Sequence, residues 1–543
     1  MSLDTFNKRS RPSIFRKLAV EQFDVLVIGG GITGGSIFRD AALRGMRVAL
    51  VEAKDFASAT SGRSSKLIHG GLRYIKNLGL GLAWESCHER NLHIRLNKRL
   101  VRPLPFLVPL YKDRGESRWL MRLGMLAYEA LSGFNNHRFH RFLSREETLS
   151  LAPALPTAGL TGGCLYYDAV INDSRWTMEV IKDGVAHAGV AVNYSPVTQL
   201  LHEGERVVGA RVYDELSGNH YDVRSKVVIN ATGIFADQIR GLDGRAAAKP
   251  RPLSKGTHLV FAEEDVPLST TIVFSSPLDG RSLFLARHEE CFLYGTSDHW
   301  EEANPDLPIP ASTDVEYLLA SLNRFMPEAQ LDRSKVQFVY SGFRPLISNG
   351  TDPSSVTRED YIEVAPSGLV SVAGGKLTTA RITAVRVLDR IIKLIGRDPA
   401  WSECKTHNVS IGGTNEAVAE SLAYWVRRCP RLTSYFRVLY QRYGLDADEI
   451  CAEVVGIHEG SDPVAEPIRA EVQYVCRHEM VCTLEDLIDR RAGFLYWNVE
   501  KRLERLRYGA NVIRAELDLT EPEFESQFLA YREHLKRFHS LPE

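Results

Sequence analysis

The residues best suited to chemistry in this chain begin with a glycine-rich turn that follows an apolar run. Gly29, Gly31 and Gly34 occupy the first, third and sixth positions of a G-x-G-x-x-G motif. Glycines at these positions let the backbone turn tightly, approach a pyrophosphate and pack a helix closely against a strand. Glu52 ends the next apolar run, where a carboxylate can accept hydrogen bonds from both ribose hydroxyls of an adenosine. These residues predict the binding of a dinucleotide.

A long polar loop after Glu52 favours FAD over NAD. The segment 60–74, TSGRSSKLIHGGLRY, offers hydroxyls, small side chains and backbone donors that suit a pyrophosphate and a ring system in an extended pocket. Two later motifs, VVINATG at 227–233 and SVAGGKLTT at 371–379, are strands that end in small residues. We expect the second to start a helix whose N-terminus, together with Lys376, faces the flavin and stabilises its reduced form.

The elements that must position these motifs follow from the hydrophobic pattern. The runs at 23–29 and 47–52 predict buried parallel strands, and residues 32–44 between them predict a helix, which completes a βαβ unit. The segment 207–230 predicts an antiparallel hairpin, and 283–295 predicts another.

Helical patterns replace strand patterns towards the end of the chain. A strand at 369–373 and an amphipathic helix at 377–395 precede the helix breakers of GRDPAWSE at 396–403. Long helical stretches follow at 417–428 and 499–517. We therefore divide the chain into a basic arm at 1–22, an FAD-binding domain with interleaved substrate-binding (antiparallel-sheet) segments at 23–395, and a helical domain at 400–543.

Composition limits the classes of function. The 543 residues hold 67 basic and 68 acidic side chains, so the chain is not a wholly basic nucleic-acid binder, and we predict no nucleic-acid partner. Eight cysteines without a CxxC pair, and no leader-like apolar segment, favour reduced thiols and a cytoplasmic protein. The basic arm is expected to be solvated, with a weak membrane contact as the alternative.

The motifs resemble those of the FAD-dependent, quinone-linked glycerol-3-phosphate dehydrogenases, which are glutathione-reductase-like flavoproteins. Similarity runs from about 22 to 395 and resumes near 470–490. The departures from the family pattern, NATGIF, LTTAR and GTSDHW, concern fine specificity more than the reaction class. The matching stretches are GGGITG, TSGRSSKLIHGGLRY, NATG, KGTHLV at 255–260, YSGFRPL at 340–346 and GGKLTT.

The resemblance implies a fold and an FAD site. The fold class is α/β: a glutathione-reductase-like FAD-binding Rossmann fold with an antiparallel-sheet substrate-binding domain and an all-helical C-terminal domain. His69 leaves covalent attachment of the flavin open, and no metal site is expected. The implied FAD contacts are Gly29, Gly31, Gly34, Glu52, Thr60, Ser64, Ser65, Lys66, Leu67, His69, Gly71, Leu72, Ala231, Gly233, Gly375, Lys376, Leu377 and Thr378.

The resemblance also implies sn-glycerol 3-phosphate as the substrate. Its dianion requires several cations, and Arg73, Arg344 and Lys376 lie in the matching motifs, with Tyr74 as a further hydrogen-bond donor. His258 matches the family's histidine and is the expected general base, so the expected catalytic residues are His258, Arg344 and Arg73. Hydride passes from substrate C2 to flavin N5, dihydroxyacetone phosphate leaves, and a quinone takes the electrons.

A quinone acceptor requires contact with a membrane surface. No apolar run of 18 residues predicts a spanning helix, so we expect a monotopic protein, peripheral on the inner face of the cytoplasmic membrane. The segment 117–134 has the pattern of an interfacial helix, although a core helix with a basic rim remains the alternative. Its expected membrane-facing side chains are Trp119, Leu120, Leu123, Leu126 and Tyr128, among the basic residues Arg114, Arg118 and Arg122.

The sequence leaves two other functions open. A glycerol-3-phosphate oxidase would share the fold and both sites but pass electrons to O2 and make hydrogen peroxide. A non-catalytic flavin-binding sensor would need the flavin loop but not the phosphate cations. A homodimer is also left open.

Overall fold

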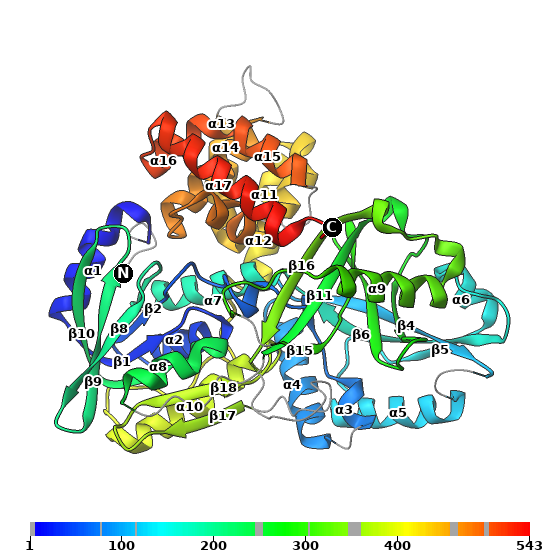
Figure 1. The fold of residues 1–543 in the computed structure, drawn as a ribbon, viewed down its shortest axis with the longest axis horizontal. Helices are drawn as coiled ribbons and strands as arrows, with labels where there is room; N and C mark the ends of the chain where they lie inside the picture. Colours follow the sequence, from blue (N-terminus) through cyan, green and yellow to red (C-terminus); the bar gives the residue numbers. More distant parts are fainter. Residues whose placement is uncertain are drawn as a thin grey trace.

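Two β-sheets lie side by side, and a helical domain covers the junction between them (Figure 1). The computed structural model describes residues 6–76, 79–113, 117–244, 253–301, 304–345, 360–456, 465–492 and 499–542.

The first sheet is mostly parallel and carries the glycine-rich turn. Its strands follow the order β17-β18-β10-β1-β2-β7, and β9 and β8 extend it beside β10. β1 pairs in parallel with β2 and with β10. Its apolar, largely β-branched run is buried, as expected for a parallel sheet that is covered on both faces. The strands are β1 (Gln22–Ile28), β2 (Val48–Val51), β7 (Val190–Val192), β8 (Val197–Glu203), β9 (Arg206–Asp214), β10 (Asn219–Asn230), β17 (Asp360–Val364) and β18 (Val370–Gly374).

The second sheet is mostly antiparallel and follows the order β15-β11-β14-β13-β12-β4-β6-β3, with β16 beside β11 and β5 beside β6. In the pairing of β11 with β16, Ser254 lies opposite Arg344 and His258 lies opposite Tyr340. The strands are β3 (Leu67–Ile68), β4 (Arg102–Tyr111), β5 (Arg141–Leu143), β6 (Leu160–Val170), β11 (Leu253–Ala262), β12 (Thr271–Ser275), β13 (Ser282–His288), β14 (Cys291–Gly295), β15 (His299–Glu301) and β16 (Val336–Arg344).

Helices cover both sheets, and the largest apolar cluster lies between β1, β2, β10 and the helices α2 and α10. A separate cluster holds the C-terminal helices together. The helices of the two sheets are α1 (Arg11–Val20), α2 (Ile32–Leu43), α3 (Leu72–Lys76), α4 (Leu80–Leu96), α5 (Arg118–Leu131), α6 (Arg145–Leu151), α7 (Asp173–Ala186), α8 (Ala236–Leu242), α9 (Ser312–Phe325) and α10 (Ala380–Ile395). The C-terminal helices are α11 (Asn415–Arg428), α12 (Thr433–Tyr443), α13 (Ala447–Gly456), α14 (Ala465–His478), the π-helix η11 (Asp486–Arg491), α15 (Val499–Tyr508), α16 (Ala510–Leu517) and α17 (Glu521–His539).

Two helices differ from the sequence expectation. The helix expected from residue 377 begins at Ala380, because Gly374 and Gly375 adopt positive φ angles of 74° and 81° and residues 377–379 form a turn. The long helix expected at 499–517 is two helices, which meet at Gly509. Glycine inside a helix is destabilising, so it is a natural point for this break.

The expectation of a solvated N-terminal arm is wrong for residues 6–20. Ile14, Phe15 and Leu18 of α1 are buried in the main apolar cluster. Arg11 is also buried and forms a 2.5 Å ion pair with Asp214 on β9. The apolar face of α1 outweighs its positive charge, which is why this segment packs against the first sheet.

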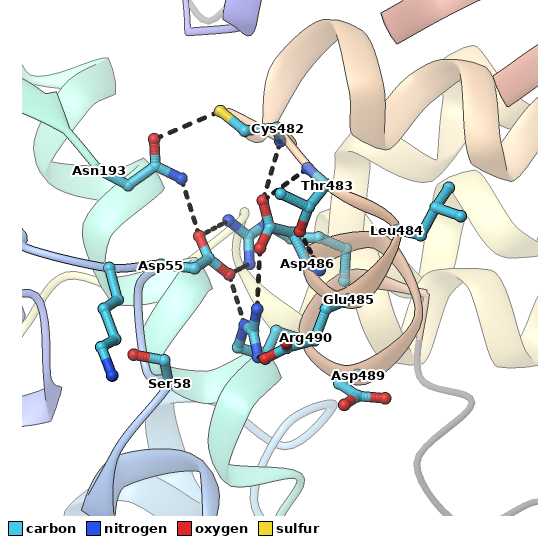
Figure 2. A network of polar contacts seen from close by, with 12 residues as sticks. Asp55, Ser58, Asn193, Cys482, Thr483, Leu484, Glu485, Asp486, Asp489 and Arg490 are labelled. Atoms are coloured by element: carbon cyan, nitrogen blue, oxygen red, sulfur yellow. Dashed lines mark hydrogen bonds and ion pairs between the residues drawn. The ribbon is translucent and has the colours of Figure 1, made fainter. Parts of the chain in front are cut away.

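The C-terminal helices meet the first sheet through a buried ionic seam. Figure 2 shows Asp55 between Asn193 and Arg490, with Asp486 next to them. Asp55 pairs with Arg490 at 2.5 Å and with Arg491 at 2.7 Å. Burial alone would raise the pKa of Asp55, but the guanidinium groups of Arg491 and Arg490 outweigh it and hold the pKa at about 2. Breaking such a pair leaves a buried charge unpaired, so these ion pairs fix how the C-terminal helices join the first sheet.

Candidate active site

A single cavity of about 740 Å³ lies where the two sheets and the C-terminal helix meet. Its walls include the glycine-rich turn after β1, the loop 57–69, the ends of β10 and β18, parts of β11 and β16, and the end of α17. A volume of this size is typical of a cofactor site, and residues far apart in the sequence surround it.

The glycine-rich turn is shaped for close approach. Gly29 has a φ of 110°, a conformation that side chains disfavour. A Cβ atom on Gly34 would lie 1.9 Å from the carbonyl oxygen of Gly29, so only glycine lets α2 pack this closely against the turn. Gly34 therefore serves the packing of helix on strand and is not among the described residues that line the cavity.

Glu52 lines the end of the cavity at the glycine-rich turn. Its carboxylate accepts hydrogen bonds from the N–H groups of Gly30 at 2.6 Å and Lys54 at 2.9 Å. Burial raises the pKa of Glu52, whereas these two N–H groups lower it. The carboxylate lines the cavity and keeps lone pairs that can accept ribose hydroxyls, so this end fits a dinucleotide.

The loop after Glu52 is held in place by bonds to distant elements. The Thr60 hydroxyl donates to the carbonyl of Phe343 at 2.8 Å. Ser64 donates to Asp173 from both its N–H and its hydroxyl. Lys66 is fully buried and forms an ion pair with the same carboxylate, so its ammonium supports the loop from behind and does not line the cavity.

The glycine pair at the end of β18, Gly374 and Gly375, brings Lys376 to the cavity wall. Its ammonium lies 4.3 Å from the centre of the Tyr74 ring and donates to Ser86. Tyr74 therefore contacts Lys376 through its ring and is not among the described residues lining the cavity. Because α10 starts at Ala380, Lys376 lies four residues before the helix, whereas the expected start at residue 377 put it next to the first helical residue.

His258 lines the cavity from β11. Its Nε2 atom lies 2.9 Å from the Ser65 hydroxyl, and its ring stacks on Tyr340 with 4.8 Å between ring centres. Burial, and then the charges of Arg344 and Lys66, lower the pKa of His258 to about 3. The imidazole is therefore neutral at pH 7 and carries a lone pair that can accept a proton.

Arg344 is the last residue of β16 and lines the cavity. Three groups hold its guanidinium in place. Its Nη1 atom pairs with Asp298 at 2.5 Å and donates to Ser254 at 3.1 Å, while Nη2 donates to Thr296 at 3.1 Å. A Cβ atom on Gly256 would lie 2.3 Å from the guanidinium, so this glycine provides the room for it. The KGTHLV motif thus supplies both the histidine and the space for the arginine.

The cavity brings together most of the residues expected from the sequence. Five of the expected residues are not among the described residues that line the cavity: Gly34, Lys66, Gly71, Leu72 and Tyr74. The side chain of Arg73 lies outside the described part of the chain. Gly71 leaves room for the Tyr74 ring, which a Cβ atom would approach to 2.1 Å. The expected residues on the wall are Gly29, Gly31, Glu52, Thr60, Ser64, Ser65, Leu67, His69, Ala231, Gly233, His258, Arg344, Gly375, Lys376, Leu377 and Thr378.

Sequence reasoning missed the contribution of the C-terminal domain. Glu485, His534, Arg537 and Phe538 line the same cavity, although they lie more than a hundred residues after the last flavin motif. No sequence motif links these four residues to the flavin motifs at a fixed spacing. Asp298, the partner of Arg344, could have been found, because it stands in the GTSDHW stretch that departs from the family pattern.

Comparison with known proteins identifies the family. Residues 24–390 match the model of FAD dependent oxidoreductases, and residues 404–523 match the C-terminal domain of alpha-glycerophosphate oxidase. Relatives named aerobic glycerol-3-phosphate dehydrogenase are 31% identical: that of Staphylococcus epidermidis over 97% of this chain and 96% of its own, and that of Staphylococcus aureus over 99% and 97%. The chain belongs to the family of FAD-dependent glycerol-3-phosphate dehydrogenases. FAD is its cofactor.

Solved structures support the same fold class. The glycerol-3-phosphate dehydrogenase of Bacillus halodurans, complexed with FAD, superposes with a TM-score of 0.82 at 28% identity, covering 98% of both chains. An L-alpha-glycerophosphate oxidase of Mycoplasma pneumoniae has a TM-score of 0.54 at 17% identity and covers 69% of this chain and 95% of its own, so it shows only a shared fold. The expected fold of FAD-binding sheet, antiparallel sheet and helical C-terminal domain is confirmed.

The membrane helix expected at 117–134 needs one correction. Trp119, Leu120, Leu123 and Leu126 are exposed on α5 as expected, but Tyr128 is buried. Its hydroxyl donates to Asp168 at 2.6 Å, because it lies on the face of α5 that packs against the protein. Arg114 lies outside the described residues. No described helix is long and apolar enough to cross a bilayer.

Proposed function

We propose that this flavoenzyme oxidises sn-glycerol 3-phosphate to dihydroxyacetone phosphate and passes the electrons to a membrane quinone. The observation that carries the proposal is the shared cavity, in which the dinucleotide turn and the side chains of His258, Arg344 and Lys376 line one continuous wall. The names of the similar dehydrogenases support the same substrate. FAD, when bound, supplies the acceptor for the hydride and two electrons.

The cations of the cavity would bind the phosphate. Arg344 presents a planar guanidinium whose orientation is fixed by Asp298 and Thr296. Such a donor suits the oxygens of a phosphate better than a flexible ammonium does. Lys376 adds a second positive charge on the same wall, and Arg73 is expected to add a third. Together they would hold the dianion and fix which carbon faces the flavin.

His258 would take the proton of the C2 hydroxyl. Ser65 holds the ring through Nε2, and the neutral imidazole has one nitrogen able to accept a proton. The low pKa of about 3 makes a weak base in the free enzyme. A bound dianion places negative charge near the ring and raises its pKa towards the working pH, which favours proton transfer only when substrate is present.

The experiment that tests the reaction is anaerobic mixing of the oxidised holoenzyme with sn-glycerol 3-phosphate. We expect the flavin absorbance at about 450 nm to decrease as the flavin is reduced. Arg344→Met should bleach much more slowly, since it removes the fixed phosphate donor. No bleaching of the wild-type enzyme would contradict the proposal and favour the non-catalytic sensor.

An exposed apolar face on α5 supports the membrane and quinone part of the proposal. Trp119 and Leu120 are 67% and 53% exposed, and basic Arg118 and Arg122 lie over Phe142 beside them. Figure 1 shows α3, α4 and α5 on the side of the molecule away from the C-terminal helices. An apolar face with a basic rim suits the headgroup boundary of an anionic membrane.

This assignment can be tested with vesicles that contain anionic lipid. Trp119→Glu with Leu123→Glu should release the enzyme from sedimenting vesicles while activity with a soluble dye is kept. The matched control is Tyr424→Glu with Leu529→Glu, which changes exposed apolar residues of the C-terminal domain. Unchanged sedimentation of the first variant would overturn the assignment.

An oxidase remains the second candidate, because residues 404–523 match a domain model named for an oxidase. An oxidase would pass its electrons to O2 and yield about one hydrogen peroxide per substrate oxidised. A dehydrogenase would yield little peroxide in air and would reduce a short-chain quinone quickly. Measuring both products in one preparation separates the two.

A further inference from the structure

Three metal-ligating side chains meet beside the cavity, all from the C-terminal domain. Asp489 lies in η11, His534 lies in α17, and His539 ends α17. One oxygen of Asp489 and one ring nitrogen of each histidine lie within 4.8 Å of one another. Oδ2 of Asp489 and Nε2 of His534 are 3.7 Å apart. Two atoms that each lie about 2.1 Å from a tetrahedral ion are ~3.4 Å apart, so this pair is close to ligating geometry.

Each of the three side chains is oriented by a partner on its other polar atom. Nδ1 of His539 lies 3.3 Å from the carbonyl oxygen of Val339, and since a carbonyl only accepts, Nδ1 carries the hydrogen and Nε2 the lone pair. Nδ1 of His534 faces Glu485 at 3.5 Å, whereas its buried Nε2 has no hydrogen-bond partner within the described part of the chain. Metal-ligating histidines typically donate their other N–H to a carbonyl or carboxylate in this way.

Asp489 is held in the same manner. Its Oδ1 atom accepts hydrogen bonds from the Tyr531 hydroxyl at 2.6 Å and from Arg502 at 2.9 Å. These bonds fix the carboxylate and leave Oδ2 to face the imidazole of His534. Asp489 and His534 thus each have one polar atom anchored and another turned towards the other residue. One ring nitrogen of His539 lies within 4.8 Å of both ligand atoms.

We propose that Asp489, His534 and His539 form a binding site for a divalent transition-metal ion of the zinc type. Two imidazoles and one carboxylate suit such an ion, whereas Ca²⁺ and Mg²⁺ prefer oxygen ligands. Arg502 offsets part of the charge of Asp489, which further disfavours a hard cation that depends on carboxylate charge.

An ion at this point would connect three parts of the fold. It would join α17 to η11 through its ligands and reach β16 through the bond from His539 to Val339. His534 also lines the flavin cavity, so the ion would fix the part of the wall that the C-terminal domain provides. The sequence pattern did not predict this site, because Asp489 stands 45 residues before His534 and no ligand motif spans that gap.

The test is a titration of the EDTA-dialysed holoenzyme with ZnCl₂. We expect one Zn²⁺ per chain, visible d–d absorption when CoCl₂ replaces zinc, and a higher melting temperature with zinc. His534→Gln and His539→Gln should each weaken zinc binding at least about tenfold, as the loss of a ligand requires. The matched control is His187→Gln, which removes a histidine beside Asp183 in α7 and should leave zinc binding unchanged.

The outcomes decide the proposal without relying on activity. Equal zinc affinity in the wild-type enzyme and His534→Gln, or no zinc bound by the wild-type enzyme, overturns it. His534 is partly exposed, so its variant keeps the test valid if loss of the buried His539 prevents folding. Flavin content and circular dichroism report whether each variant is folded.

Discussion

The two halves of the cavity are made of different parts of the polypeptide. The dinucleotide half is mainly backbone: glycines that allow close approach, N–H groups and the carboxylate of Glu52. The half where we propose that substrate binds is made of side chains from paired strands, in which His258 and Arg344 are each held by a neighbour. The first half depends on local chain conformation, whereas the second depends on long-range strand pairing.

This difference predicts that the two halves fail in different ways. Damage to the dinucleotide half should lower the flavin content of the purified protein. Damage to the substrate half should leave the flavin in place and lower turnover.

The largest effect is expected for His258→Gln. Loss of a general base lowers turnover roughly 10²–10⁴-fold, and flavin content should stay normal because β11 and its pairing are retained. Steady-state kinetics with a soluble dye measures the loss. His288→Gln is the control, since this buried histidine on β13 bonds to the carbonyl of Ile171 and does not line the cavity. A fall of similar size in the control would contradict a special role for His258.

Gly34→Ala should act on the other half. Its Cβ atom would meet the carbonyl oxygen of Gly29 at 1.9 Å, so α2 must move. Overpacking costs about 1–3 kcal/mol, which corresponds to roughly five- to 160-fold weaker flavin binding if the whole cost falls on the bound state. The ratio of flavin to protein absorbance reports it.

Gly124→Ala in α5 provides the comparison, because nothing lies within 4 Å of its new Cβ atom. It should retain full flavin content. If Gly34→Ala binds flavin normally but loses turnover, the separation between the two halves is wrong.

Asp298→Asn should have a smaller effect. It removes the ion pair that orients Arg344 but keeps the guanidinium, so kcat/KM should fall about tenfold, or ~1.4 kcal/mol, mainly through KM. Asp279→Asn removes a carboxylate near Arg281 away from the cavity wall and serves as the control. An unchanged KM for Asp298→Asn would show that Arg344 needs no orientation from this residue.

A pH dependence of stability is expected from the same histidine. His258 has a pKa of about 3 when folded and an ordinary value near 6.5 when unfolded, so unfolding takes up a proton between these values. The stability that this histidine contributes is complete above about pH 6.5 and falls by up to about 1.4 kcal/mol per pH unit as the pH drops towards 3.

Denaturant unfolding of the wild type and His258→Gln at pH 5.0 to 8.0 measures this contribution. The difference in their free energies of unfolding should increase with pH up to about 6.5 and then stay level. A difference that does not change with pH would mean that the folded pKa of His258 is not depressed.

Much of the fold could be predicted because its signals are local. The apolar run at 23–29, the glycine motif and the strand before Glu52 became β1, the turn and β2 almost residue for residue. The hairpin of β9 and β10 was also expected, since turn residues and alternation lie close together in the chain. The start of α10 and the break at Gly509 were not, because helix ends depend on a few backbone angles.

The sequence by itself determined the dinucleotide turn, the flavin loop and the family, because these rest on residue types at fixed short spacings. Only the tertiary structure decided that Lys66 stands behind the loop with Asp173, that Asp298 holds Arg344, and that α17 closes the cavity. Those contacts join residues tens to hundreds of positions apart. Their partners are selected by the packing and charge balance of the whole fold, which no short motif records.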